Sequence, residues 1–172
     1  MSDLRADGVP ELVDAWRMVA ARRGFEGHAP LAALMRLRDS LDEAEGEVRF
    51  ALDFGTDALQ VPFVDLDIEA DLPLQCQRSL RRFLLPVQIR QRLGLIRRES
   101  DEAALPADCE PLLVPADGML RLLDLVEDEL ILALPVVPVA PDSEAIERDF
   151  APGPEENAAH GAFSALAEWK KP

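Results

Sequence analysis

Two neighbouring runs of alternating apolar and polar residues limit the folds open to this chain more than any other feature. Between 65 and 76 the even positions, from Leu66 to Cys76, are apolar, and most odd positions are acidic. Between 83 and 95 most odd positions, from Phe83 to Leu95, are apolar. A period of two is typical of a strand with one buried face. The short separation of the runs predicts that they pair as a long antiparallel hairpin.

The register of this hairpin can be predicted by placing both apolar sets on the same face. The pairs expected in this register are Leu74 with Leu85, Leu72 with Val87, Glu69 with Arg90, and Asp67 with Arg92. Opposite charges then face each other across the strands, and each such pair stabilises a sheet by roughly 0.2–1 kcal/mol.

The remaining elements follow from hydrophobic periodicity. Apolar residues recur at helical spacing in three segments, 10–23, 30–41 and 120–134. Alternation from 45 to 54 predicts a further strand, 25–29 is expected to be extended, and 112–114 is expected to be a short edge strand. We therefore predict an α+β fold with an antiparallel sheet built on the long 59–97 hairpin and packed by about three helices.

The last predicted helix ends before Pro135, and an apolar stretch, 134–139, follows it. It is interpreted as a buried strand rather than an exposed groove for a partner, because exposed stretches of this kind aggregate. Residues 1–139 are expected to form one domain. Residues 140–172 are acidic and rich in proline, glycine and alanine, which predicts a mobile tail. A short docking segment is expected at 163–169.

Composition limits the classes of function. The formal net charge of −15 argues against general affinity for nucleic acid, and is more typical of a surface that keeps a protein soluble or binds basic partners. No stretch is apolar for the roughly 20 residues of a membrane span, and no export signal is recognisable, so we expect a cytoplasmic protein. No phosphate-binding loop, dinucleotide motif or nucleophile motif occurs. We therefore expect no catalytic residue, small-molecule substrate or cofactor.

An arginine-rich window is the best candidate for contact with RNA or the ribosome. Residues 77–98 contain seven arginines and no acidic residue, and the planar guanidinium suits phosphate and base contacts. Arg90 and Arg92 are expected to pair with carboxylates across the hairpin. The candidates for contact are therefore Arg78, Arg81, Arg82, Arg97 and Arg98, although a solvated hairpin tip is an alternative interpretation.

A run of three acidic residues, Glu127, Asp128 and Glu129, lies in the last predicted helix. Neighbours in sequence do not share a helix face, so a metal or acid–base site is disfavoured. We expect Glu127 and Asp128 to project outward and Glu129 to lie on a flank. A solvated face is the simpler interpretation, and a dock for a basic partner is the alternative.

Four segments together resemble the YceD family of large ribosomal RNA accumulation proteins. The most specific is EDELILALPVVPV at 127–139, in which an acidic helix leads into an apolar strand. The others are LPLQCQRS at 72–79, ALPADCEPLLV at 104–114 and AFSALAEWKK at 162–171. Many relatives carry CxxC where this chain has Cys76 and Ser79. A hydroxyl is a poor zinc ligand, so we expect no metal here.

The resemblance implies a non-enzymatic role in biogenesis of the large ribosomal subunit, supporting synthesis or accumulation of its RNA. Two hypotheses about the partner stay open. In the first, the arginine-bearing hairpin contacts precursor ribosomal RNA. In the second, the chain is an acidic module that chaperones a basic large-subunit ribosomal protein without touching RNA. Members of the family are typically encoded beside a large-subunit ribosomal protein.

Overall fold

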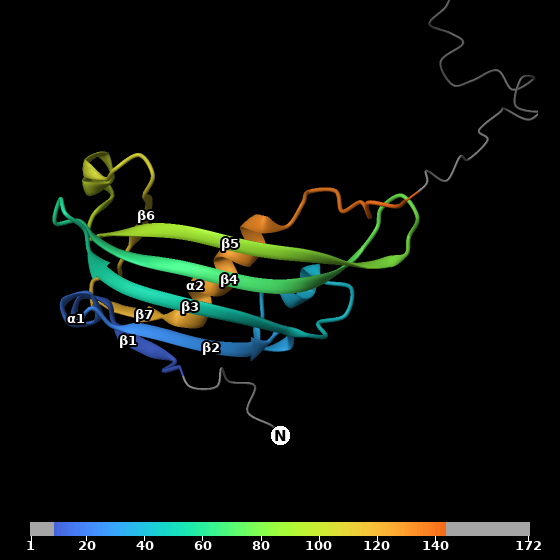
Figure 1. Cartoon of the computed structure of the whole chain (residues 1–172), viewed down its shortest axis with the longest axis horizontal. Helices are drawn as coiled ribbons and strands as arrows, with labels where there is room; N and C mark the ends of the chain where they lie inside the picture. Colours follow the sequence, from blue (N-terminus) through green and yellow to red (C-terminus); the bar gives the residue numbers. More distant parts are fainter. Residues whose placement is uncertain (1–8, 144–172) are drawn as a thin grey trace, which may run out of the picture.

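A five-stranded sheet forms the body of the molecule (Figure 1) in the computed structural model, which describes residues 9–143. Its strands, in spatial order, are β2 (Gly24–Pro30), β3 (Glu47–Thr56), β4 (Pro62–Gln75), β5 (Arg82–Ile96) and β6 (Glu110–Leu113). Neighbouring strands are antiparallel, except for the parallel pair β5–β6. The predicted α+β class and the long β4–β5 hairpin at its centre are confirmed.

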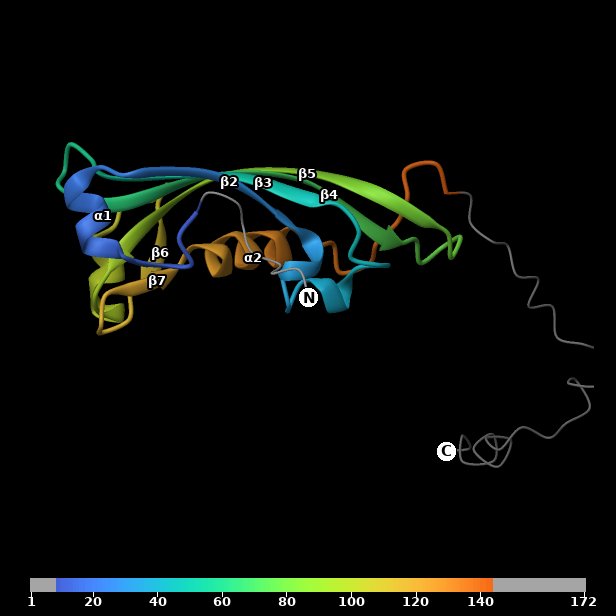
Figure 2. The ribbon, with the colours of Figure 1, turned by 90° about the horizontal axis from the view of Figure 1, so that it is seen from below.

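The other elements cover one face and one end of this sheet (Figure 2). They are β1 (Leu12–Asp14), which pairs with β7 (Met119–Arg121), the helices α1 (Ala15–Ala21) and α2 (Leu122–Ala133), and the 3-10 turns η1 (Leu31–Ala33), η2 (Arg38–Ser40) and η3 (Glu99–Ala104). Within residues 9–143, no helix is long and apolar enough to cross a membrane.

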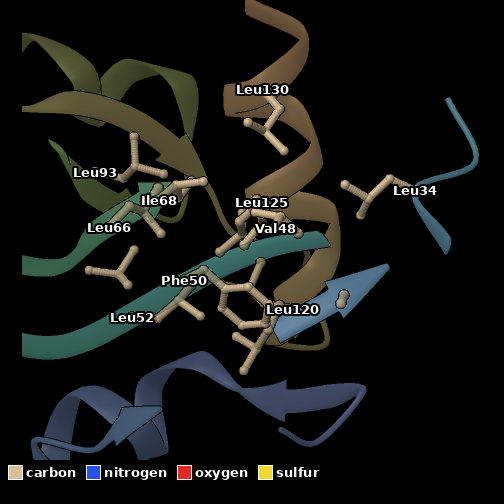
Figure 3. Close-up of a cluster of buried hydrophobic side chains, with 14 of the residues drawn as sticks. Leu34, Val48, Phe50, Leu52, Leu66, Ile68, Leu93, Leu120, Leu125 and Leu130 are labelled. Carbon is tan, nitrogen blue, oxygen red and sulfur yellow. The ribbon is translucent and has the colours of Figure 1, made fainter. Parts of the chain in front are cut away.

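The core lies between the sheet and α2 (Figure 3). The even positions of β3 and β4 point inward, which confirms the alternation seen in the sequence. Fully burying an aliphatic side chain of this size is worth roughly 1.5–3 kcal/mol. The labelled core residues of Figure 3 are Leu34, Val48, Phe50, Leu52, Leu66, Ile68, Leu93, Leu120, Leu125 and Leu130.

The register of the β4–β5 hairpin differs from the prediction by two residues. The observed pairs are Leu74 with Phe83, Leu72 with Leu85, Glu69 with Gln88, Asp67 with Arg90, and Asp65 with Arg92. A shift of two leaves every side chain on its predicted face, so the hydrophobic pattern cannot detect it. The turn decides the register, because Cys76 donates its backbone N–H to the Arg81 carbonyl at 2.9 Å and accepts from Leu80 N at 2.8 Å.

The predicted helix over 30–41 is wrong as a continuous α-helix, since only η1 and η2 form there. Leu31, Leu34 and Leu37 are nevertheless buried, as the spacing indicated. The backbone N–H groups of Arg36 and Leu37 bond to the Glu127 side chain instead of to a preceding turn. A long-range acceptor has thus replaced the helical carbonyl acceptors of these two N–H groups.

The first predicted helix, 10–23, is shortened to Ala15–Ala21. Its expected first turn is β1, which pairs with β7 and so takes an extended conformation. Asp14 then caps the helix by accepting the backbone N–H of Arg17 at 3.0 Å. Arg22 ends it in the left-handed conformation, with φ of 47°.

The apolar stretch 134–139 is not the buried strand that we predicted. It pairs with no described strand, and the exposed fractions of Val136 and Val137 are 100% and 59%. Pro135 and Pro138 lack the backbone N–H that a sheet strand needs. The same Pro135 ends α2 at Ala133, as predicted. The tail expected over 140–172, with its docking segment 163–169, lies almost entirely outside the described residues.

Candidate functional site at the hairpin tip

Two segments far apart in sequence meet at the tip of the β4–β5 hairpin. They are the turn 76–81 and the stretch 134–140, which together we call the hairpin-tip site. Gln77 donates its backbone N–H to the carbonyl of Pro138 at 2.8 Å. Ala140 donates its backbone N–H to the Cys76 sulfur at 3.3 Å. These bonds hold the stretch that follows α2 against the hairpin turn.

Cys76 lies at the centre of this junction and its side chain is fully buried. Its sulfur accepts hydrogen bonds from Ser79 and from the backbone N–H of Ala140, and these bonds, led by the Ser79 side chain, lower the pKa of Cys76 to about 6. Hydrogen bonds donated to sulfur favour the thiolate. Ser79 therefore acts as a donor to the sulfur.

The outer surface of the hairpin-tip site is unusually apolar. Val136, Val137 and Val139 are exposed in the stretch after α2, and Leu80 is exposed in the turn. Leu80 adopts a positive φ of 57°, a conformation that costs energy for a branched or bulky residue. Exposed apolar patches rimmed by polar groups mark sites of protein contact. This surface is therefore a candidate for binding a partner.

Two of the five candidate arginines border this surface. Arg78 and Arg81 are exposed, and neither forms an ion pair with any described residue. Arg82 is adjacent but is already bound, with nitrogen–oxygen distances of 2.8 Å to Glu43 and 3.1 Å to Glu45. Among the described arginines at the hairpin tip, Arg78 and Arg81 are thus the two that can bind an anion without breaking an ion pair.

The other two candidates, Arg97 and Arg98, lie at the opposite end of the molecule. Strand β5 separates them from the tip by roughly 45 Å. Arg97 stacks on Trp16, with 3.9 Å between the guanidinium carbon and the ring centroid. Arg98 pairs with Asp101 at 3.2 Å. The five arginines that are clustered in sequence therefore do not form one surface in the fold.

Arg90 and Arg92 pair with carboxylates across the hairpin, as predicted. Arg90 binds Asp67 at 3.1 Å, and Arg92 binds both oxygens of Asp65 at 2.6 and 2.7 Å. Their partners differ from the predicted ones because of the two-residue shift in register. Arg92 also lies over the Phe63 ring, 3.9 Å from its centroid.

The acidic residues of α2 have three different environments. Glu127 was expected to project outward, but it is buried with an exposed fraction of 5%. Its carboxylate accepts the backbone N–H groups of Arg36, at 2.6 Å, and of Leu37, at 3.1 Å. The Arg36 side chain binds both Glu127, at 2.9 Å, and Asp128, at 2.6 Å. Sequence inspection missed Arg36, because nothing local links it to a residue about 90 positions away.

Asp128 is half exposed, as expected, and Glu129 lies on the flank of α2. Partial burial, and then the nearby charges of Glu110 and Asp128, raise the pKa of Glu129. The three acids therefore do not form one patch for a basic partner. Among residues 9–143, no three histidine, cysteine or acidic side chains converge as metal ligands do.

Comparison with known proteins gives the chain a family. The family model described as "Large ribosomal RNA subunit accumulation protein YceD" matches residues 64–170. The protein of that name from Haemophilus influenzae is 27% identical over 168 residues, which cover 95% of this chain and 97% of the relative. No solved structure matches. The matched region includes both segments of the hairpin-tip site and more than half of the sequence, and this chain belongs to the YceD family.

Proposed function

We propose that this chain supports the accumulation of large-subunit ribosomal RNA as a non-enzymatic factor, by binding a basic protein of the precursor large subunit at the hairpin-tip site. One observation carries the proposal. The stretch that most resembles the family is held at the hairpin tip with its valines exposed, although burying them would be favourable. The relative's name supplies the link to ribosomal RNA.

The chemistry of the site fits a protein partner. Aliphatic side chains such as Val136 and Val137 gain free energy by leaving water, at about 25 cal/mol per Å² of apolar area. The net charge of −15 attracts a basic partner over long range and speeds its association. Aliphatic side chains provide no aromatic surface on which RNA bases could stack.

Direct contact with precursor RNA is the second candidate function. It is favoured by Arg78 and Arg81, which are exposed and form no ion pair within the described residues. Each arginine that binds a phosphate releases a counterion, so RNA affinity through this pair would fall with rising salt. Two such contacts provide much weaker binding than the five candidate arginines would provide on one surface.

Affinity capture of tagged protein from cells, with and without ribonuclease, tests the proposal. The double variant Val136→Ser/Val137→Ser removes the apolar surface, and should reduce capture of large-subunit ribosomal proteins by at least roughly tenfold. The bound ribosomal protein should survive ribonuclease in the wild type. Leu59→Ser is the matched control, because Leu59 is 76% exposed at the opposite end of β4, and this variant should capture normally.

Charge reversal at Arg78 and Arg81 separates the two candidates. If the partner is RNA, Arg78→Glu/Arg81→Glu should abolish capture of large-subunit RNA, and ribonuclease should release every ribosomal protein. If the partner is a protein, the valine variant should have the larger effect. Unchanged capture by both double variants would contradict a role for the hairpin-tip site.

A further inference from the structure

The edge of β5 that faces away from β4 is largely unpaired. Within residues 9–143 only β6 pairs with this edge, and its register covers Leu93 to Ile96 alone. The preceding part of β5, from Arg82 to Arg92, therefore forms a margin of the sheet (Figure 1). Such an edge presents backbone donors and acceptors to an incoming strand.

The backbone groups that face this free edge can be identified. Ile96 accepts a hydrogen bond on its carbonyl from Val114 N at 2.9 Å, on the β6 side. Backbone groups alternate in direction along a strand, and the β4–β5 register is continuous. Even-numbered residues of β5 therefore point to the free edge. Pro86, which has no N–H to contribute, occupies an even position, so the donors are Arg82, Leu84, Gln88, Arg90 and Arg92.

The inner side of the same edge is incompletely covered. Leu85, Val87 and Ile89 are half-buried, whereas their register partners on β4 are buried. An additional strand beside β5 would carry side chains over this apolar strip. Its residues should therefore alternate between apolar and polar, as those of a sheet strand with one buried face do.

Unpaired acids lie near the β6 end of the free edge and on the neighbouring strand β4. Asp108 and Glu110 lie where β6 begins. Asp71 is the register partner of Pro86. Glu129 lies near enough to Glu110 for their charges to interact. None of these four forms an ion pair within the described residues. Arg90 and Arg92 do not neutralise these four acids, because each arginine is bound to its own carboxylate across the hairpin.

We propose that the free edge of β5 binds an extended, lysine- or arginine-rich segment of a partner protein as an additional β-strand. Strand addition of this kind obtains affinity from backbone hydrogen bonds and specificity from alternate side chains. A second copy of this chain is disfavoured as the added strand because of its charge of −15. Residues 144–172 of the same chain are disfavoured because they carry six acids against three bases. This surface is separate from the hairpin-tip site, and so goes beyond the proposed function.

Titration of the full-length protein with a peptide of alternating lysine and valine tests the proposal. The peptide should bind, and an alternating glutamate–valine peptide should not. Methylating the peptide's backbone nitrogens on its pairing edge should weaken binding at least tenfold, because it removes donors without changing charge. Equal binding of the methylated peptide would overturn the proposal, as would no binding of the lysine peptide.

Two substitutions at one position provide the matched test in the protein. Gln88→Pro removes an edge N–H, whereas Gln88→Ala keeps it, and both remove the side-chain bond to Glu69. Only the proline variant should lose peptide affinity. The valine double variant at the hairpin tip should keep it, so that failure here is distinguishable from failure of the proposed function.

Amide hydrogen exchange in the wild type locates the contact without any substitution. On peptide binding, exchange should slow at Gln88, Arg90 and Arg92, and should stay unchanged at Val87 and Ile89, which already bond to β4. Uniform slowing along β5, or slowing only at β2, would contradict strand addition at this edge. Formation of a dimer without peptide, seen by sedimentation, would assign the edge to a second copy instead.

Discussion

At the scale of single residues, the buried carboxylate of Glu127 accepts two backbone N–H groups that carbonyls would bind in a helix. Both oxygens of Glu127 are bound, one to two backbone N–H groups and the other to the Arg36 guanidinium. A buried acceptor that loses its partners, or a buried donor left without one, costs about 1–3 kcal/mol. Glu127 therefore fixes the segment between β2 and β3 on α2.

Replacing Glu127 should destabilise the protein much more than replacing its neighbour. Glu127→Ala leaves the N–H groups of Arg36 and Leu37 without their acceptor, and should lower the free energy of unfolding by about 3 kcal/mol. Asp128→Ala breaks only an exposed ion pair, so the loss should be below about 1 kcal/mol. Urea denaturation measures both. Similar losses in the two variants would show that Glu127 has no special structural role.

At the scale of elements, hydrogen bonds join the stretch after α2 to the hairpin turn. The stretch after α2 is bonded through Pro138 and Ala140, while its valines point to solvent. Cys76 contributes the sulfur that accepts from Ala140. The protonation of this thiol should therefore alter how firmly the two segments are joined.

The stability of the protein should depend on the ionisation of Cys76. Its pKa is lowered from the ordinary 9.0 to about 6, chiefly by the hydrogen bond from Ser79. The folded state thus holds fewer protons than the unfolded state between these values. The free energy of unfolding should rise with pH from about 6 to 9, and the gain should be lost as pH falls through about 6.

Chemical denaturation at a series of pH values, on wild type and Cys76→Ser, measures this dependence. The serine variant should lack the rise that the thiolate causes. Cys109→Ser is the matched control, because burial raises the pKa of Cys109, so this thiol stays protonated when folded over that range. A profile for Cys76→Ser that parallels the wild type would contradict a thiolate at the junction.

The spacing of apolar residues in the sequence predicted those elements in which buried residues recur at one constant interval. The strands β3, β4 and β5 and the helix α2 follow from alternation or helical spacing alone. The segment 30–41 misled the prediction because Leu31, Leu34 and Leu37 are buried equally well in an irregular loop, once a distant carboxylate binds its backbone. The hairpin register failed because a shift of two residues preserves both faces.

The candidate site was predictable only in part, for a similar reason. The exposure of Arg78 and Arg81 at the turn follows from their position between two strands. The separation of Arg97 and Arg98 from them follows from the length of β5, which the sequence already implied. The meeting of Pro138 with Gln77 has no local signal, because it joins residues about 60 positions apart.

At the scale of the whole molecule, repulsion among like charges is the main electrostatic feature. The chain carries 33 acidic and 18 basic residues, and most described arginine pairs are exposed and so contribute little. Excess charge of one sign destabilises a compact state through self-repulsion. The outer face of β4 adds little to this excess, because Asp65, Asp67 and Glu69 are each paired with an arginine.

Added salt should therefore stabilise the folded protein. Raising sodium chloride from about 0.01 M to 0.15 M shortens the screening length from about 30 Å to 8 Å, which weakens long-range repulsion more than contacts between adjacent charges. The Tm should rise by several degrees, as measured by circular dichroism. A fall in Tm would mean that the cross-strand ion pairs stabilise the folded protein by more than repulsion among the excess acids destabilises it.

The pairing of β1 with β7 has a consequence for how the protein is made. Synthesis delivers β1 first, and its partner leaves the ribosome only after more than a hundred further residues. The inner face of the sheet is covered later still, because α2, which covers it, is the last described element. A growing chain that ends before Leu122 carries a complete hairpin with its leucines uncovered. Until translation passes this helix, the nascent protein is itself a client for chaperones.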